Sequence, residues 1–140
     1  MILSAPATLL TAAVTLLAVL VAFWTMILVA RARTRTGIHA PATTGSPDLE
    51  CALRIQANTV EQFILFMPSL WMATLYFQGW APGAVGLLWC LGRILYSFGY
   101  SPAKPGGRAP GFMIAILSTL VLWVLGAIGI VMAFMAASAS

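Results

Sequence analysis

The sequence predicts an all-α integral membrane protein in which four transmembrane helices form a bundle, in a single domain over residues 1–140. Of the 140 residues, 61% are hydrophobic and only 7% are charged, and the mean hydropathy is +1.00. An ordinary soluble domain carries about a quarter of charged residues. A hydrocarbon core of about 30 Å requires about 20 apolar residues per helix, so the chain is long enough for four spans and little else.

The first predicted helix covers about residues 3–30. It is longer than the apolar region of a cleavable signal peptide, and Arg31, Arg33 and Arg35 follow it instead of preceding it. This order is typical of an uncleaved anchor whose N-terminus is translocated. Residues 31–48, which are rich in Thr, Gly and Pro, are expected to form a polar loop.

The second helix is expected at about residues 49–77, with a kink at Pro68 because an internal proline removes one backbone hydrogen bond. A tight, uncharged turn over residues 79–83 leads to a third helix at about residues 84–100. After a second polar loop, the fourth helix is expected at about residues 112–136.

The basic residues outside the helix interiors predict the topology. The second loop and both tails have none, and all of them lie in or beside the first and third loops: Arg31, Arg33, Arg35, Lys104 and Arg108. The positive-inside rule places these two loops in the cytoplasm and both termini outside, and the short loops and tails suggest a bacterial inner membrane. The net charge of +4 rests on too few residues for a nucleic-acid-binding patch.

The cysteines and tryptophans are expected to have structural roles. Cys51 and Cys90 fall in predicted helices without a Cys-x-x-Cys partner or a neighbouring histidine, so no metal site is expected and both are interpreted as small apolar residues. The side chains of Trp71, Trp80 and Trp89 are expected at the membrane interfaces or facing lipid.

A polar stripe runs along the second predicted helix. At about 100° per residue, Glu50, Arg54, Asn58 and Glu61 project within about 80° of one another. An ionisable residue within a spanning helix costs about 2.5–3.5 kcal/mol and is read first as part of a functional site.

The third helix carries Arg93, Tyr96 and Tyr100 on one face, within about 60°. The helix directions place both stripes in the cytoplasmic half, with Arg93 and Glu61 at comparable depth. The sequence is therefore consistent with an ion pair between Arg93 and Glu61, and a ligand contact by Glu61 is an equal alternative. Polar contacts that only hold helices together are common in membrane bundles. With Arg108 included, however, the polar groups exceed what packing requires, and this excess of donors indicates an anionic ligand.

These motifs resemble the MAPEG family of membrane-associated proteins in eicosanoid and glutathione metabolism. The resemblance spans about residues 49–112 and rests on Arg54-x-x-x-Asn58-x-x-Glu61, on Gly92-Arg93-Ile-Leu-Tyr96-Ser-Phe-Gly-Tyr100, and on Arg108 after them. It implies a homotrimer of four-helix protomers that binds glutathione between neighbouring subunits, open to the cytoplasm. Carried over by motif, the residues that would bind the tripeptide are Arg54, Asn58, Glu61, Tyr96 and Tyr100, and the catalytic Arg108 would stand beside its sulfur.

The resemblance also points to particular branches of the family. The tyrosine at position 96 resembles the residue found in the leukotriene synthase and microsomal glutathione transferase branches. Ala57 stands where the prostaglandin E synthase branch has an additional arginine. The implied function is a glutathione transferase that activates glutathione as a thiolate for conjugation to lipophilic electrophiles from the membrane lipid. Reduction of lipid hydroperoxides is a further activity that this chemistry allows. A first-loop arginine assists the second substrate in some members, and the sequence does not select among Arg31, Arg33 and Arg35.

Two other classes of protein stay open at this point. A four-span chain with an intramembrane carboxylate is compatible with a small proton-coupled multidrug transporter, although Glu61 shares its stripe with Arg54, which does not suit a cationic drug. A noncatalytic membrane scaffold is the other alternative. It would tolerate replacement of Asn58, Tyr96 and Tyr100.

Overall fold

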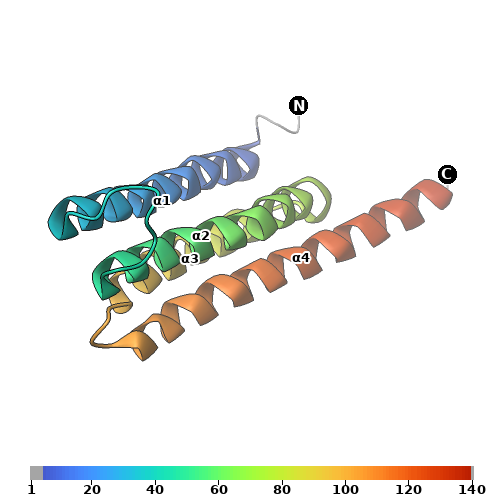
Figure 1. Cartoon of the computed structure of the whole chain (residues 1–140). Coiled ribbons are helices and arrows are strands. Elements are labelled where there is room, and N and C mark those ends of the chain that lie inside the picture. The colour runs from blue at the N-terminus through green and yellow to red at the C-terminus, as the bar shows by residue number, and fades with distance from the viewer. Residues whose placement is uncertain (1–4, 140) are drawn as a thin grey trace.

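A computed structural model describes residues 5–139 and contains four long helices that run alternately up and down (Figure 1). All four are long and apolar enough to cross a membrane, which confirms the predicted all-α, four-span fold class. The helices are α1 (Pro6–Thr36), α2 (Pro47–Met72), α3 (Ala81–Gly99) and α4 (Ala109–Ser138).

The bundle has α1 and α4 on opposite sides, and each of them packs against both α2 and α3. Helices α2 and α3 meet across the centre, where the rings of Phe66 and Trp89 stack at 4.1 Å between centroids with an interplanar angle of 6°. Leu70, Val14 and Leu122 complete this core. The core therefore contains side chains of all four helices, with the Phe66–Trp89 stack at the α2–α3 contact.

Trp89 corrects one expectation from the sequence. Its side chain is fully buried, so the prediction that it lies at an interface or faces lipid was wrong, whereas Trp80 is 60% exposed. The reason is that Trp89 lies on the face of α3 that is directed at Phe66 of α2. The position of a tryptophan along a predicted helix does not by itself indicate on which face of the bundle its side chain lies.

Helix α1 is longer than predicted because residues 31–36 continue the helix instead of joining the loop. Arginine and threonine are tolerated in a helix, and the stop is provided by Gly37. Its φ of 70° is left-handed, and its N–H donates to the carbonyl of Arg33. The chain from Gly37 to Ser46 then connects α1 to α2.

The remaining helix ends differ from the sequence-based boundaries for similar reasons. Helix α2 continues into a π-helical turn over Ala73–Phe77. Helix α3 begins at Ala81 because Pro82 is tolerated in a first turn. A 3₁₀ turn over Pro105–Arg108 leads directly into α4. Arg108 therefore lies in a helical turn and not in an extended loop.

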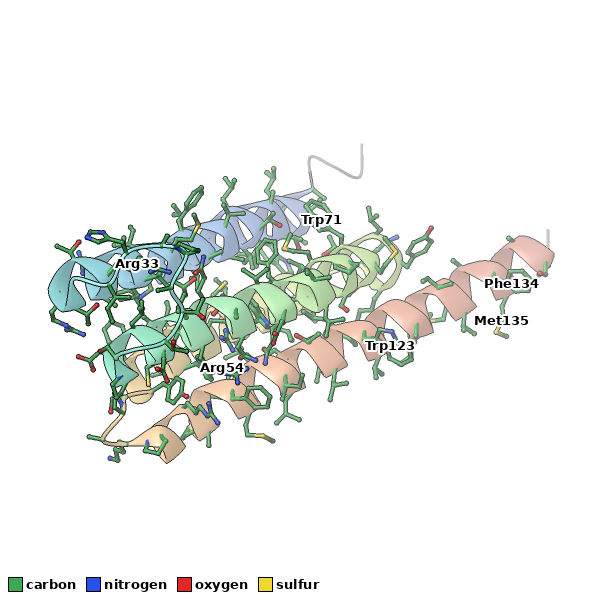
Figure 2. The ribbon with its side chains drawn as sticks, viewed as in Figure 1. Arg33, Arg54, Trp71, Trp123, Phe134 and Met135 are labelled. Atoms are coloured by element: carbon green, nitrogen blue, oxygen red, sulfur yellow. The ribbon has the colours of Figure 1, made fainter. Side chains whose placement is uncertain are left out.

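The connections place both basic segments together. The α1–α2 and α3–α4 connections lie at one end of the bundle, and the start of α1 and the end of α4 lie at the other (Figure 1). Near its C-terminal end α4 extends past the other helices, and Phe134 and Met135 there are 74% and 65% exposed (Figure 2). We call the part of the bundle nearest the two basic connections the site half, and the opposite part the apolar half.

Candidate functional site

The site half contains three neighbouring cavities, and Arg54 of α2 lines all of them. The largest has a volume of about 660 Å³ and includes Tyr96 and Arg108 in its wall. A second of about 630 Å³ includes Glu50 and Glu61, and a third of about 410 Å³ includes Glu50. Figure 2 shows Arg54 in the space between α2 and α4. The structure therefore brings the polar residues of three segments together around one arginine.

The guanidinium of Arg54 is available to a ligand. The residue is exposed on the protomer, and within residues 5–139 no hydrogen bond or ion pair is formed by its side chain. Arginine presents five N–H donors in a fixed, planar arrangement. Such a group in a spanning helix requires an acceptor from elsewhere, which is a feature expected of a binding site for an anion.

Arg93 of α3 is fully buried and has different partners from those expected. Its Nη1 donates to Asn58 Oδ1 at 3.1 Å, and its Nη2 donates to Thr59 Oγ1 at 2.7 Å. The guanidinium carbon also lies 4.2 Å from the centroid of the Tyr96 ring. Three groups from two helices therefore hold this cation within the bundle.

The ion pair between Arg93 and Glu61 does not form. Across the described chain, the side-chain ion pair that meets a 4.0 Å limit joins Arg35 to Asp48, at 3.1 Å. The physical reason is the direction of Glu61, which is about 200° around the α2 axis from the buried Thr59 and is exposed. Counting residues along the two helices placed Arg93 at the correct depth beside α2. Arg93 meets the face of α2 that carries Thr59, however, and not the face that carries Glu61.

Glu61 is linked to Arg93 indirectly. Asn58 Nδ2 donates to Glu61 Oε2 at 3.4 Å, while Asn58 Oδ1 accepts from Arg93. Glu50 lies in the first turn of α2, where a carboxylate is favoured by the helix dipole, and its Oε1 accepts from the N–H of Gly45 at 3.2 Å. Two carboxylates therefore line the second cavity on either side of Arg54.

The other wall of the site is made by Tyr96, Tyr100 and Arg108. The two tyrosine rings lie 6.0 Å apart between centroids, and the Arg108 guanidinium carbon lies 4.5 Å from the centroid of the Tyr100 ring. Tyr96 and Arg108 line the same cavity. The 3₁₀ turn before α4 thus presents a second cation toward the cavity that Arg54 lines.

The first-loop arginines have partners near their own positions. Arg33 Nη1 donates to the carbonyls of Ile38 and Ala42 at 3.3 and 3.0 Å, and Arg31 lies 5.4 Å from the Trp24 ring centroid. With Arg35 bonded to Asp48, each of the three is engaged in the α1–α2 region. Their contacts explain how this connection is ordered.

Two residues of the site half were not singled out from the sequence. Thr59 is buried and accepts from Arg93, and Gln62 is 5% exposed with neither end of its side-chain amide bonded to another residue of the described chain. A signal existed in the sequence, because both are polar residues within an apolar span and lie three positions apart. They share a face that points inward, opposite to the stripe.

These features define an integral membrane protein with four spans and a cationic site built at one end by α2, α3 and the turn before α4. The MAPEG family model matches residues 11–128, and the chain belongs to the MAPEG family. The resemblance seen in the two helix motifs is therefore confirmed.

Individual relatives support the same branches. The chain is 39% identical to human microsomal glutathione S-transferase 2 over 107 residues, which cover 76% of this chain and 72% of the relative. It is 36% identical to leukotriene C4 synthase of Cavia porcellus over 128 residues, covering 91% of this chain and 85% of the relative. An uncharacterized protein of Synechocystis, sll1147, is 42% identical over 117 residues, which cover 84% of each chain.

Proposed function

We propose that the protein is a membrane glutathione transferase, which activates glutathione as a thiolate for conjugation to a lipophilic electrophile. The observation that carries the proposal is Arg54, which has no ion-pair partner within residues 5–139 and lines three cavities, with Arg108 in the wall of the largest of the three. The names of the relatives, a glutathione S-transferase and a leukotriene C4 synthase, favour the same chemistry.

Glutathione carries carboxylates and an ammonium group, and the site offers complementary partners for both. We assign a carboxylate of the tripeptide to Arg54, because an arginine can bind a carboxylate through two parallel hydrogen bonds. Glu61 is the proposed acceptor for the ammonium group. The amide of Asn58 and the hydroxyls of Tyr96 and Tyr100 complete the proposed glutathione contacts.

Arg108 is the proposed catalytic residue. A thiol has a reference pKa near 8.5 and is a poor nucleophile while protonated. Lowering that pKa by about two requires about 2.7 kcal/mol of preferential stabilisation of the thiolate, which a nearby guanidinium in a partly desolvated site can supply. The thiol releases its proton to solvent, and the sulfur lone pair then forms a C–S bond as the electrophile loses a leaving group or opens a ring.

The second substrate is proposed to enter from the membrane. An apolar groove of about 870 Å³ runs between α2 and α4 and includes Leu65, Met72 and Trp123 in its lining. A lipophilic molecule dissolved in the bilayer would find this surface without passing through water. The same thiolate could attack the terminal oxygen of a lipid hydroperoxide, which breaks the O–O bond, releases the lipid alcohol and leaves a glutathione sulfenic acid. A second glutathione then converts the sulfenic acid to glutathione disulfide and water, so a peroxidase activity belongs to the same proposal.

The exposure of the polar stripe supports an assembly with the site between subunits, and we propose the homotrimer that the family resemblance implies. Arg54 and Glu61 are exposed on the protomer although they belong to a spanning helix. An unsatisfied polar group costs several kcal/mol in hydrocarbon, so a neighbouring subunit and the bound tripeptide would cover them. By the positive-inside rule this end faces the cytoplasm, with both termini outside, and a bacterial inner membrane is the proposed location.

The test is equilibrium binding of glutathione to the detergent-purified protein, with the thiolate followed by ultraviolet difference absorbance. We expect Arg54→Ala to lose binding. Arg108→Ala should keep binding but form thiolate only at higher pH, so that its conjugation rate rises between about pH 7 and pH 9, toward the ordinary pKa of the thiol. Arg35→Ala is the matched control, since it removes an arginine outside the three cavities.

Two results would contradict the proposal. Full conjugating activity in Arg108→Ala, with loss of activity in Arg54→Ala, would remove the thiolate role assigned to Arg108. Absence of glutathione binding in well-folded wild-type protein would favour a transporter or a scaffold instead. Assays with an aryl halide and with a lipid hydroperoxide would separate the transferase and peroxidase reactions.

A further inference from the structure

Arg93 is a buried cation without a carboxylate in contact. Its side chain is fully buried, and within the described chain neither Asp48, Glu50 nor Glu61 forms an ion pair with it. A buried charge that lacks an opposite charge is strongly destabilising unless hydrogen bonds compensate it. A hydrophobic side chain would pack the same space at lower cost, so the residue calls for an explanation beyond packing.

The contact with Asn58 determines which way the Asn58 amide points. A guanidinium can only donate and an ionised carboxylate can only accept. The amide between them therefore directs Oδ1 to Arg93, at 3.1 Å, and Nδ2 to Glu61, at 3.4 Å. The reverse orientation would place the Nδ2 donor against the Arg93 donors and the Oδ1 acceptor against the Glu61 carboxylate. The buried cation thus acts on the exposed carboxylate through one amide group.

Arg93 is itself held in place by its other partners. Thr59 donates its hydroxyl hydrogen to the carbonyl of Ile55 at 2.7 Å, which leaves its oxygen lone pair to accept from Arg93 at 2.7 Å. The Tyr96 ring covers the guanidinium at 4.2 Å. The Arg93 guanidinium is therefore held in one place, and its hydrogen bond to Oδ1 fixes the position of the Asn58 side chain.

The position of Glu61 matters because Arg54 lines the same cavity. The two residues are seven positions, or about 10 Å along the axis, apart on one face of α2, so a Glu61 side chain released from Asn58 could pair with Arg54 if both side chains extend toward each other. Such a pair would occupy both the acceptor for a ligand cation and the donor for a ligand anion. In the structure Glu61 is bonded to Asn58, and Arg54 has no ion-pair partner in the described chain.

We propose that Arg93 is a positioning residue for recognition of the ligand's ammonium group, acting through Asn58 to keep Glu61 directed into the cavity and away from Arg54. This inference rests on the proposed binding of glutathione. It assigns Arg93 no contact with the tripeptide and no part in the chemistry at sulfur. Its effect is on the affinity for one charged group of the ligand.

The test compares two ligands, glutathione and its analogue in which the ammonium group of the γ-glutamyl residue is replaced by hydrogen. Wild-type protein should bind glutathione at least about tenfold more tightly than the analogue, since a charge-assisted hydrogen bond is lost. Arg93→Lys keeps the charge but cannot present two N–H groups in the same geometry. We expect this variant to lose most of the tenfold preference while its affinity for the analogue changes by less than about twofold.

Two further variants keep the experiment decisive. Glu61→Gln should abolish the same preference, and the Arg93→Lys/Glu61→Gln double variant should be no worse than Glu61→Gln, because the two residues act as one unit. If Arg93→Lys does not fold, Thr59→Val provides the same comparison, since it removes the hydroxyl that accepts from Arg93 Nη2, and Thr59 is not among the residues proposed to bind the ligand.

The possible failures are distinguishable. Equal weakening of both ligands by Arg93→Lys would assign the residue a purely structural role and overturn the inference, while glutathione binding by the wild type would still stand. If wild-type protein binds neither ligand, the glutathione proposal fails and the role of Arg93 fails with it.

Discussion

The site half and the apolar half are made by the same helices but differ in the hydrogen-bond partners of their buried polar side chains. In the apolar half, buried hydroxyls donate to carbonyls of their own helix, as Ser69 does to Leu65 at 2.8 Å and Thr74 to Leu70 at 2.8 Å. In the site half, polar side chains bond between helices, as Arg93 does to Asn58 and Thr59. The difference indicates that a membrane helix can carry hydroxyl groups without a functional role when their own helix satisfies them, whereas a buried cation bonded to polar groups of another helix marks the site.

The largest expected effect comes from the glycines at which α4 approaches the rest of the bundle. A Cβ at Gly111 in the site half would lie 2.6 Å from the Gly92 carbonyl oxygen and 2.7 Å from Tyr96 Cα. A Cβ at Gly129 in the apolar half would lie 2.7 Å from the Tyr76 carbonyl oxygen. Backbone atoms cannot rotate away, so we expect each Gly→Ala change to lower the free energy of unfolding by about 3 kcal/mol.

The same pair of variants tests whether the halves are functionally separate. Gly111→Ala should also weaken glutathione binding because it displaces the backbone of Tyr96, whereas the folded fraction of Gly129→Ala should bind normally. Thermal unfolding in detergent and glutathione titration measure the two quantities. Equal loss of binding in both variants would mean that the halves are not independent.

The next largest effect is expected at Arg54. Because this exposed side chain has no hydrogen-bonding or ion-pair partner in residues 5–139, Arg54→Ala should leave the melting temperature unchanged within error. It should weaken glutathione binding by about 1.5–3 kcal/mol, or about 10- to 150-fold. Arg35→Ala, which breaks an exposed ion pair, should change neither quantity by more than about 1 kcal/mol. A lower melting temperature in Arg54→Ala would show a structural role that the static contacts do not reveal.

A smaller effect is expected from the one buried interhelical hydroxyl pair of the apolar half within the described chain. Thr11 Oγ1 and Thr74 Oγ1 lie 2.9 Å apart and join α1 to the π-helical turn. Thr11→Val keeps the shape and removes this bond, and polar contacts of this kind in membrane bundles contribute about 0.6 kcal/mol on average. Denaturant titration should detect a loss of that size with unchanged glutathione affinity. A change in affinity would contradict the separation of the halves.

The smallest effect, and one of opposite sign, is expected at Gln62. Both ends of its buried amide lack a partner from residues 5–139, so replacement by an apolar residue of similar size removes a desolvation cost. Gln62→Leu should leave stability unchanged or raise it by up to about 1 kcal/mol. A clear loss of stability would indicate that Gln62 is satisfied by an ordered water or by a neighbouring subunit.

The helices were predictable because the bilayer imposes one simple requirement, a run of about 20 apolar residues. Their ends were less so. The left-handed Gly37 ends α1 after Thr36, later than predicted, and Pro82 lies in the first turn of α3, within the predicted turn. Helical periodicity predicted that Arg54, Asn58 and Glu61 share one face of α2. It also predicted that Arg93 shares a face of α3 with Tyr96. It did not identify Thr59 as a partner of Arg93, because that contact depends on how α2 and α3 face each other.

The sequence by itself determined the number of spans, the polar stripe on α2 and the family, since each depends on composition, helical periodicity or spacing along one chain. Only the tertiary structure decided that Trp89 lies in the core and that Arg93 reaches Glu61 through Asn58 instead of pairing with it. The physical reason is that depth along a helix follows from counting residues, whereas the face that meets a neighbouring helix follows from side-chain packing across the whole bundle.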